Sequence, residues 1–110
     1  MANSFKRKVS RDIGTSLTSI GNYTVGTGVE TTCIGLTLAN TTTGQIEVDV
    51  TLNDGTNDTF MIENAPIPVG SSLVVVGDLQ KVVMEPGDSM KVRSDTASSV
   101  DAIMSILEID

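Results

Sequence analysis

The side chains that most often perform chemistry in proteins are scarce in this sequence. It contains no histidine and a single cysteine, Cys33. Histidine is the commonest general base and a frequent zinc ligand, so its absence excludes the usual nucleophile–base pairs and most zinc sites. Because Cys33 has no histidine to activate it and lies in an apolar stretch, we interpret it as an inert core thiol.

Carboxylates are the remaining residues that could catalyse a reaction or bind a metal. Glu47 and Asp49 share one face of an expected strand, and a pair of carboxylates can hydrolyse glycosides. An acidic face turned to water explains the same spacing more simply. Residues 53–58 offer hard oxygen ligands suited to calcium, but the segment lacks the terminal glutamate of an EF-hand, and we interpret it as a hairpin loop. We therefore expect no catalytic residue, no bound metal, no cofactor and no enzymatic activity.

The elements that would position these residues are short strands separated by turns. From residue 20 onward, this pattern predicts an all-β chain: an antiparallel β-sandwich of about eight strands, either jelly-roll or immunoglobulin-like. The alternation over 46–52 is the clearest, with every second residue apolar, which places one face in the core and the other in water. Over 31–40, the same rule puts Ile34, Leu36 and Leu38 on one face and Cys33 on the other.

The other strands are expected from weaker signals. We expect Phe60 and Ile62 to point inward in a strand that ends before Pro66 and Pro68. The stretch 73–76 is apolar on both faces and is therefore expected to be covered. Further strands are expected around Tyr23 and Val25, at 79–84, at 90–92 and at 100–109.

The last expected strand, 100–109, has an unusual composition. An antiparallel strand with one face in water should alternate polar and apolar residues. This one is apolar on both faces, and its second face carries Ile103, Leu107 and Ile109. Either it is a central strand of the sandwich, or these three residues form a contact between subunits.

Positive charge gathers at the N-terminus of a chain whose net charge is −7. The rest of the sequence is strongly acidic, which argues against nucleic acid as a partner. Residues 1–19 show no clear period, and we interpret them as an extended N-terminal arm preceding a sandwich domain at 20–110. Such an arm could dock on an acidic neighbour, including another copy of the chain; a solvated, frayed terminus is the alternative. The arm residues expected to bind a partner are Phe5, Lys6, Arg7, Lys8 and Arg11.

Length and hydropathy set the remaining expectations. A chain of 110 residues is one domain of modest stability, for which oligomerisation is a common remedy. The N-terminal charges are not followed by the apolar segment of a signal peptide, and no apolar run is long enough to span a membrane. We expect a protein that folds in a reducing cytoplasm and has no membrane partner.

Three parts of the sequence carry a family resemblance. They are residues 1–6, residues 34–42 leading into 46–52, and the closing blocks 79–92 and 97–108. Together they resemble small virion structural proteins of tailed bacteriophages, especially those infecting marine and photosynthetic bacteria. The resemblance implies a β-sandwich assembled in symmetric copies on the virion, as a capsid decoration, neck or tail component, and it brings no catalytic residues.

The resemblance and the residues together favour a capsid decoration (cement) protein. Such a protein would form homo-oligomers, with a trimer among the expected forms, bind the major capsid protein and reside in the virion after assembly in the host cytoplasm. A neck or tail adaptor, or a fibre-base component, is the alternative within the same class. A glycan- or receptor-binding module is the alternative from another class, for which Tyr23, Phe5 and Phe60 are the available aromatic side chains.

Overall fold

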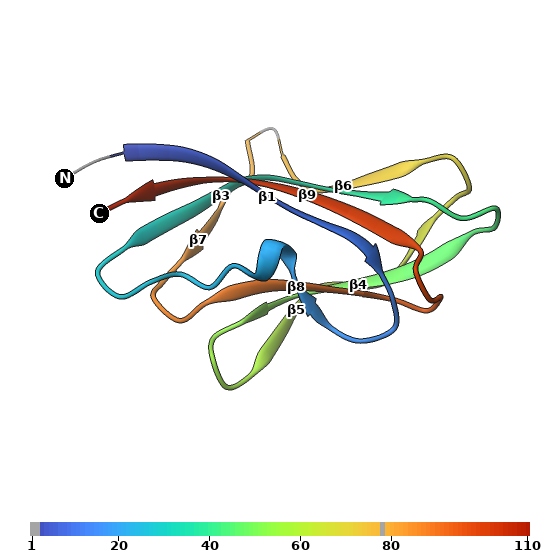
Figure 1. Ribbon diagram of the computed structural model, residues 1–110, viewed down its shortest axis with the longest axis horizontal. Helices are drawn as coiled ribbons and strands as arrows, with labels where there is room; N and C mark the ends of the chain where they lie inside the picture. Colours follow the sequence, from blue (N-terminus) through green and yellow to red (C-terminus); the bar gives the residue numbers. More distant parts are fainter. Residues whose placement is uncertain (1–2, 78) are drawn as a thin grey trace.

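The computed structural model describes residues 3–77 and 79–110, and the chain is almost entirely β (Figure 1). Within these residues, no helix is long and apolar enough to cross a membrane. The elements are β1 (Asn3–Ile13), β2 (Thr18–Ser19), the short 3-10 helix η1 (Ile20–Asn22), β3 (Glu30–Asn40), β4 (Ile46–Asn53), β5 (Asp58–Ile67), β6 (Ser72–Val76), β7 (Val82–Met84), β8 (Ser89–Ser94) and β9 (Val100–Ile109).

The strands form two antiparallel sheets, which confirms the predicted sandwich. One, here called the β9 sheet, has the order β1-β9-β3-β6, with β7 also paired to β3; the other, the β4 sheet, has the order β2-β8-β4-β5. The pairing is nested along the chain: β1 with β9, β2 with β8, β3 with β6 and β7, and β4 with β5. A chain doubled back in this way and rolled into two sheets is a jelly roll, so the immunoglobulin-like alternative is set aside.

The hydrophobic core lies between the two sheets and is built from aliphatic and methionine side chains. Figure 1 shows the β9 sheet above and the β4 sheet below, with the core in the layer between them. Each fully buried side chain of this size stabilises the fold by roughly 1.5–3 kcal/mol. The largest are Ile20, Leu36, Leu38, Ile46, Ile67, Met84, Met90, Met104 and Ile106.

Strand β3 contains a bulge that changes the predicted faces. Its register with β9 skips one position between Cys33 and Gly35, so Ile34 is the extra residue. A bulge shifts the alternation by one residue, and Cys33 therefore joins Leu36 and Leu38 in the core instead of lying opposite them. The predicted face of Cys33 is wrong, but the thiol is buried, as expected of a core cysteine. Burial raises the pKa of this thiol.

The N-terminal segment is extended, but it does not project from the sandwich. Residues 3–10 pair continuously with β9, and pairing resumes at Ile13 after a bulge. The predicted boundary between an arm (1–19) and a domain (20–110) therefore does not coincide with a structural division, because residues 3–13 form an edge strand of the β9 sheet. The half-buried side chains of residues 3–10 are those of Ser4, Lys8 and Ser10, and because they are polar the sequence shows no apolar period.

Two other predicted strands differ from the structure. Around Tyr23 the chain forms η1 and an irregular segment, because Gly21 and Asn22 adopt positive φ. Strand β5 runs through Pro66 instead of ending before it. β5 is the edge of its sheet, where a missing N–H is tolerated. The Phe60 side chain is exposed, contrary to prediction.

Candidate functional site

The β9 sheet has a second face, which points away from the core. Residues directly opposite each other in an antiparallel pair lie on the same face, so the register defines rows of neighbouring side chains across the sheet. Two such rows form what we call the outer face. The first row is Phe5–Leu107–Thr32–Val83, and the second is Val9–Ile103–Thr37–Val74.

The outer face is apolar and uncovered. Its exposed fractions are 76% for Phe5, 71% for Val83, 63% for Val74, 54% for Ile103 and 49% for Val9. Among the described residues, these are five of the eight large hydrophobic side chains that are exposed. A concentration of exposed apolar side chains on one face marks a surface that another molecule covers.

Charge is also sparse on the outer face. Arg7 lies between the two rows, opposite Ser105 on β9. The carboxylates stand at the two ends, where Glu30 pairs with Ile109 and Asp101 pairs with Ala39. In a chain of net charge −7, the centre of this face is therefore almost free of acidic groups.

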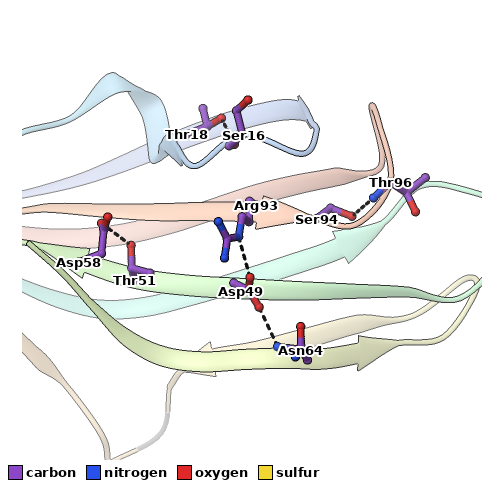
Figure 2. Close-up of polar contacts among 9 residues, drawn as sticks. All are labelled: Ser16, Thr18, Asp49, Thr51, Asp58, Asn64, Arg93, Ser94 and Thr96. Carbon is purple, nitrogen blue, oxygen red and sulfur yellow. Dashed lines mark hydrogen bonds and ion pairs between the residues drawn. The ribbon is translucent and has the colours of Figure 1, made fainter.

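The opposite outer surface, on the β4 sheet, is polar and contains the ion pair of Asp49 with Arg93. Figure 2 shows the Asp49 carboxylate between Arg93 and Asn64: it accepts hydrogen bonds from Arg93 Nε and from the Asn64 N–H, both at 2.7 Å. Burial opposes ionisation of Asp49, but these two donors outweigh it and hold the pKa of Asp49 below its ordinary value. The Phe60 ring lies 5.8 Å from the Arg93 guanidinium. The prediction that Asp49 faces water is wrong, because Arg93 and β5 cover it.

The structure divides the predicted arm residues into two groups. Lys6 and Lys8 point to the core side of β1: Lys6 Nζ lies 2.8 Å from Glu108 Oε1, and Lys8 Nζ lies 5.0 Å from the centre of the Tyr23 ring. Phe5 and Arg7 belong to the outer face, and Arg11 lies in the bulge between Ser10 and Ile13. Within residues 3–77 and 79–110, neither Arg7 nor Arg11 forms an ion pair.

Lys6 is part of a polar cluster that holds β1 to the rest of the β9 sheet. The Tyr23 hydroxyl donates a hydrogen bond of 2.5 Å to Glu108 Oε2 and lies 2.8 Å from Thr31 Oγ1. Burial, reinforced by the bond to Glu108, raises the pKa of Tyr23 to about 12. Lys6 and Tyr23 both stabilise the ionised form of Glu108 and lower its pKa. This cluster links four segments: β1, the segment at Tyr23, β3 and β9. We therefore interpret Lys6, Tyr23 and Glu108 as residues that stabilise the fold.

Polar side chains of residues 53–58 also form hydrogen bonds within the fold. Asp54 accepts the N–H groups of Thr56 and Asn57, and Asp58 accepts from Asn53, so residues 53–58 form the predicted hairpin loop. The described part of the chain contains no group of three histidine, cysteine, aspartate or glutamate side chains placed to hold a metal.

A hollow of about 470 Å³ lies at one end of the outer face, between β3 and β7. Glu30, Val83 and Glu85 are among the residues that line it, so the lining is of mixed polarity.

The predicted contact residues of the last strand belong to this surface. Ile103 is exposed, whereas Leu107 and Ile109 are partly buried. β9 is a central strand, between β1 and β3, which confirms the first interpretation of its sequence. It also presents an open apolar face, and a contact between subunits through that face stays a prediction. Sequence reasoning missed Val74 and Val83, although the stretch 73–76 was recognised as apolar on both faces.

Comparison with known proteins rests on solved structures, because no family model and no curated protein matches the sequence. A chain in the acid-stable capsid of the Helicobacter pylori bacteriophage KHP30 aligns with a TM-score of 0.55 and 10% identity, over 100% of this chain and 94% of that one. The chain is similar in fold to a bacteriophage capsid chain. The predicted resemblance to phage virion structural proteins is thus confirmed at the level of the fold.

Two structures of a pentameric capsid protein from metagenomic phage sequences also align. They have TM-scores of 0.41 and 0.42 and identities of 22% and 21%. In both, the alignment covers 91% of this chain and 60% of the other.

Proposed function

We propose that this chain is a structural subunit of a bacteriophage particle, and specifically a capsid decoration protein that stabilises the head. The observation that carries the proposal is the apolar, charge-poor outer face of the β9 sheet, which has to be covered in the functional state. A protein whose purpose is assembly needs such a face, and it needs none of the catalytic groups whose scarcity the sequence already indicates.

The fold supports the same proposal. Jelly rolls recur in viral capsid and lectin domains, and the KHP30 capsid chain aligns along the whole of this one. The lectin alternative has little support from the site. Tyr23 is buried and Phe60 lies against Arg93, so Phe5 is the one aromatic side chain free for sugar stacking in the described residues.

The copy number per particle tests the proposal. Purified virions of the phage that encodes this chain would be analysed by quantitative mass spectrometry, with the major capsid protein as internal reference. A decoration protein is expected at hundreds of copies, in a fixed ratio to the capsid lattice. A dozen copies or fewer would contradict decoration and indicate the neck or tail, and absence from the particle would contradict the virion role altogether.

A further inference from the structure

We infer that the outer face of the β9 sheet binds a second copy of this chain, packed face to face about a two-fold axis that runs parallel to the strands between β9 and β3. The inference deepens the proposed function and rests on its premise that this face is an assembly contact.

The two rows of the outer face are complementary to themselves under this rotation. The axis places β1 of one copy over β7 and β6 of the other, and β9 over β3. In the first row, Phe5 then meets Val83 of the second copy, and Leu107 meets the Thr32 methyl group. Every exposed apolar side chain of the row is covered by an apolar group.

The second row behaves in the same way. Val9 meets Val74 of the second copy, and Ile103 meets the Thr37 methyl group. One rotation therefore covers all five exposed hydrophobic side chains of the face. This matches the general rule that a two-fold contact uses the same patch on both subunits.

The position of Arg7 selects this axis over its main competitor. A two-fold axis perpendicular to the strands would also superpose apolar residues, with Phe5 on Val9. It would, however, stack Arg7 directly on Arg7 of the second copy, because Arg7 lies midway between the rows. Burying two like charges against each other is strongly unfavourable. The axis parallel to the strands instead sends the two Arg7 side chains to opposite edges of the contact.

The size of the face is compatible with a specific pair. The outer residues of β9 run from Asp101 to Ile109, a length of about 27 Å, and four strands span about 19 Å. Two copies would bury on the order of 1,000 Å², at the lower end of specific interfaces. Such a contact closes with two copies, so the pair is an alternative to the trimer expected from the sequence.

The net charge of the chain also affects which surfaces of two copies can come into contact. Two copies of net charge −7 repel each other at a distance. They can approach closely only through a surface poor in carboxylates, which is the character of the outer face. Salt screens the long-range repulsion and leaves the apolar contact in place, so association should strengthen as salt is added.

Sedimentation of the full chain tests the contact. We expect a concentration-dependent dimer for the unmodified protein, and Ile103→Asp and Phe5→Glu should each weaken it at least about 100-fold, because each buries an unpaired carboxylate. Val69→Asp is the matched control, since Val69 is equally exposed outside the face. Circular dichroism would verify that each variant is folded. A monomer at every concentration, or a dimer that survives both face variants, would overturn the inference.

Cross-linking of mixed variants tests the axis. Protein carrying Phe5→Cys would be mixed with protein carrying Val83→Cys and treated with a short bismaleimide; only a mixed pair places these two thiols together. The native Cys33 is fully buried and gives an unreactive background. We expect efficient cross-linking of this mixture and little with Phe5→Cys plus Val9→Cys. The opposite preference would overturn the proposed axis, whereas the copy number in the virion tests the proposed function independently.

Discussion

Ionisation of Tyr23 offers a direct test of the polar cluster that fixes β1 to the β9 sheet. Tyr23 is the sole tyrosine of a chain without tryptophan. Phenolate absorption in the near ultraviolet therefore reports this one side chain. We expect its titration in the folded protein to be centred at about pH 12, because burial and the hydrogen bond to Glu108 favour the neutral phenol.

The same shift predicts how stability depends on alkaline pH. In the unfolded chain Tyr23 ionises near its ordinary pKa of 10.0, while in the folded chain it ionises at about 12. The stabilisation from this group is thus fully present and independent of pH below pH 10, and it is lost as the pH rises from 10 to 12. A shift of about two units corresponds to a loss on the order of 2–3 kcal/mol.

The assay combines a spectroscopic titration with urea unfolding at a series of alkaline pH values. Titration in concentrated urea serves as the control and should return the ordinary pKa. Tyr23→Phe should remove most of the extra loss of stability between pH 10 and 12. A folded-state midpoint near 10 for the reversible titration would refute the reasoning, because it would mean that the hydroxyl is neither buried nor bonded to Glu108.

Three further predictions concern other parts of the fold. Arg93→Ala should lower the free energy of unfolding by about 1–3 kcal/mol, since the buried Asp49 carboxylate loses a charged hydrogen-bond partner; because the pKa of Asp49 should then rise, the loss should shrink in urea titrations at acidic pH, and an equal loss at all pH values would contradict this. Met104→Ala should cost about 2–5 kcal/mol by opening a cavity between the sheets, and a change in melting temperature no larger than that of an exposed-site variant would be inconsistent with its burial. Gly21→Ala should destabilise more than Gly28→Ala: both glycines have positive φ, but only at Gly21 would a new Cβ meet a β1 side chain, at 2.7 Å. Equal melting temperatures for these two variants would exclude crowding at Gly21.

Local hydrophobic patterns in the sequence predict the strands that have one face in the core and the other on the surface. The alternation over Ile46–Asn53 fixes β4, because the period of two leaves the core as the only place for its apolar face. The continuous apolar character of residues 100–109 likewise predicts β9. In both cases the information that a strand forms lies within a single stretch of the chain, although burial departs from the sequence pattern at Asp49 and Thr51, which are buried, and at Ile103, which is exposed.

Features that depend on distant partners could not be predicted in this way. The bulge at Ile34 exists because β3 pairs with β9, and it reverses the face of Cys33 without any local signal. The pairing of residues 3–10 with β9 also depends on a partner that is distant in the sequence. As an edge strand, β1 buries few side chains, so its sequence resembles that of a free arm. Asp49 appears solvated in the sequence because the residues that cover it come from β8 and β5.

The candidate site shows a different limit of sequence reasoning. An apolar face on a strand indicates that something covers it, but it does not distinguish another layer of the same chain from another molecule. Residues 73–76 were expected to be buried or covered, yet Val74 is exposed in the single chain.

The sheet register supplies the evidence that a single stretch of sequence lacks. It brings the surplus apolar residues of β1, β6, β7 and β9 onto one side of one sheet, while the other outer surface is polar and pairs Asp49 with Arg93. Scattered exposed hydrophobic residues would need no explanation. Their concentration on a single charge-poor face is the reason to regard this chain as one part of a larger assembly.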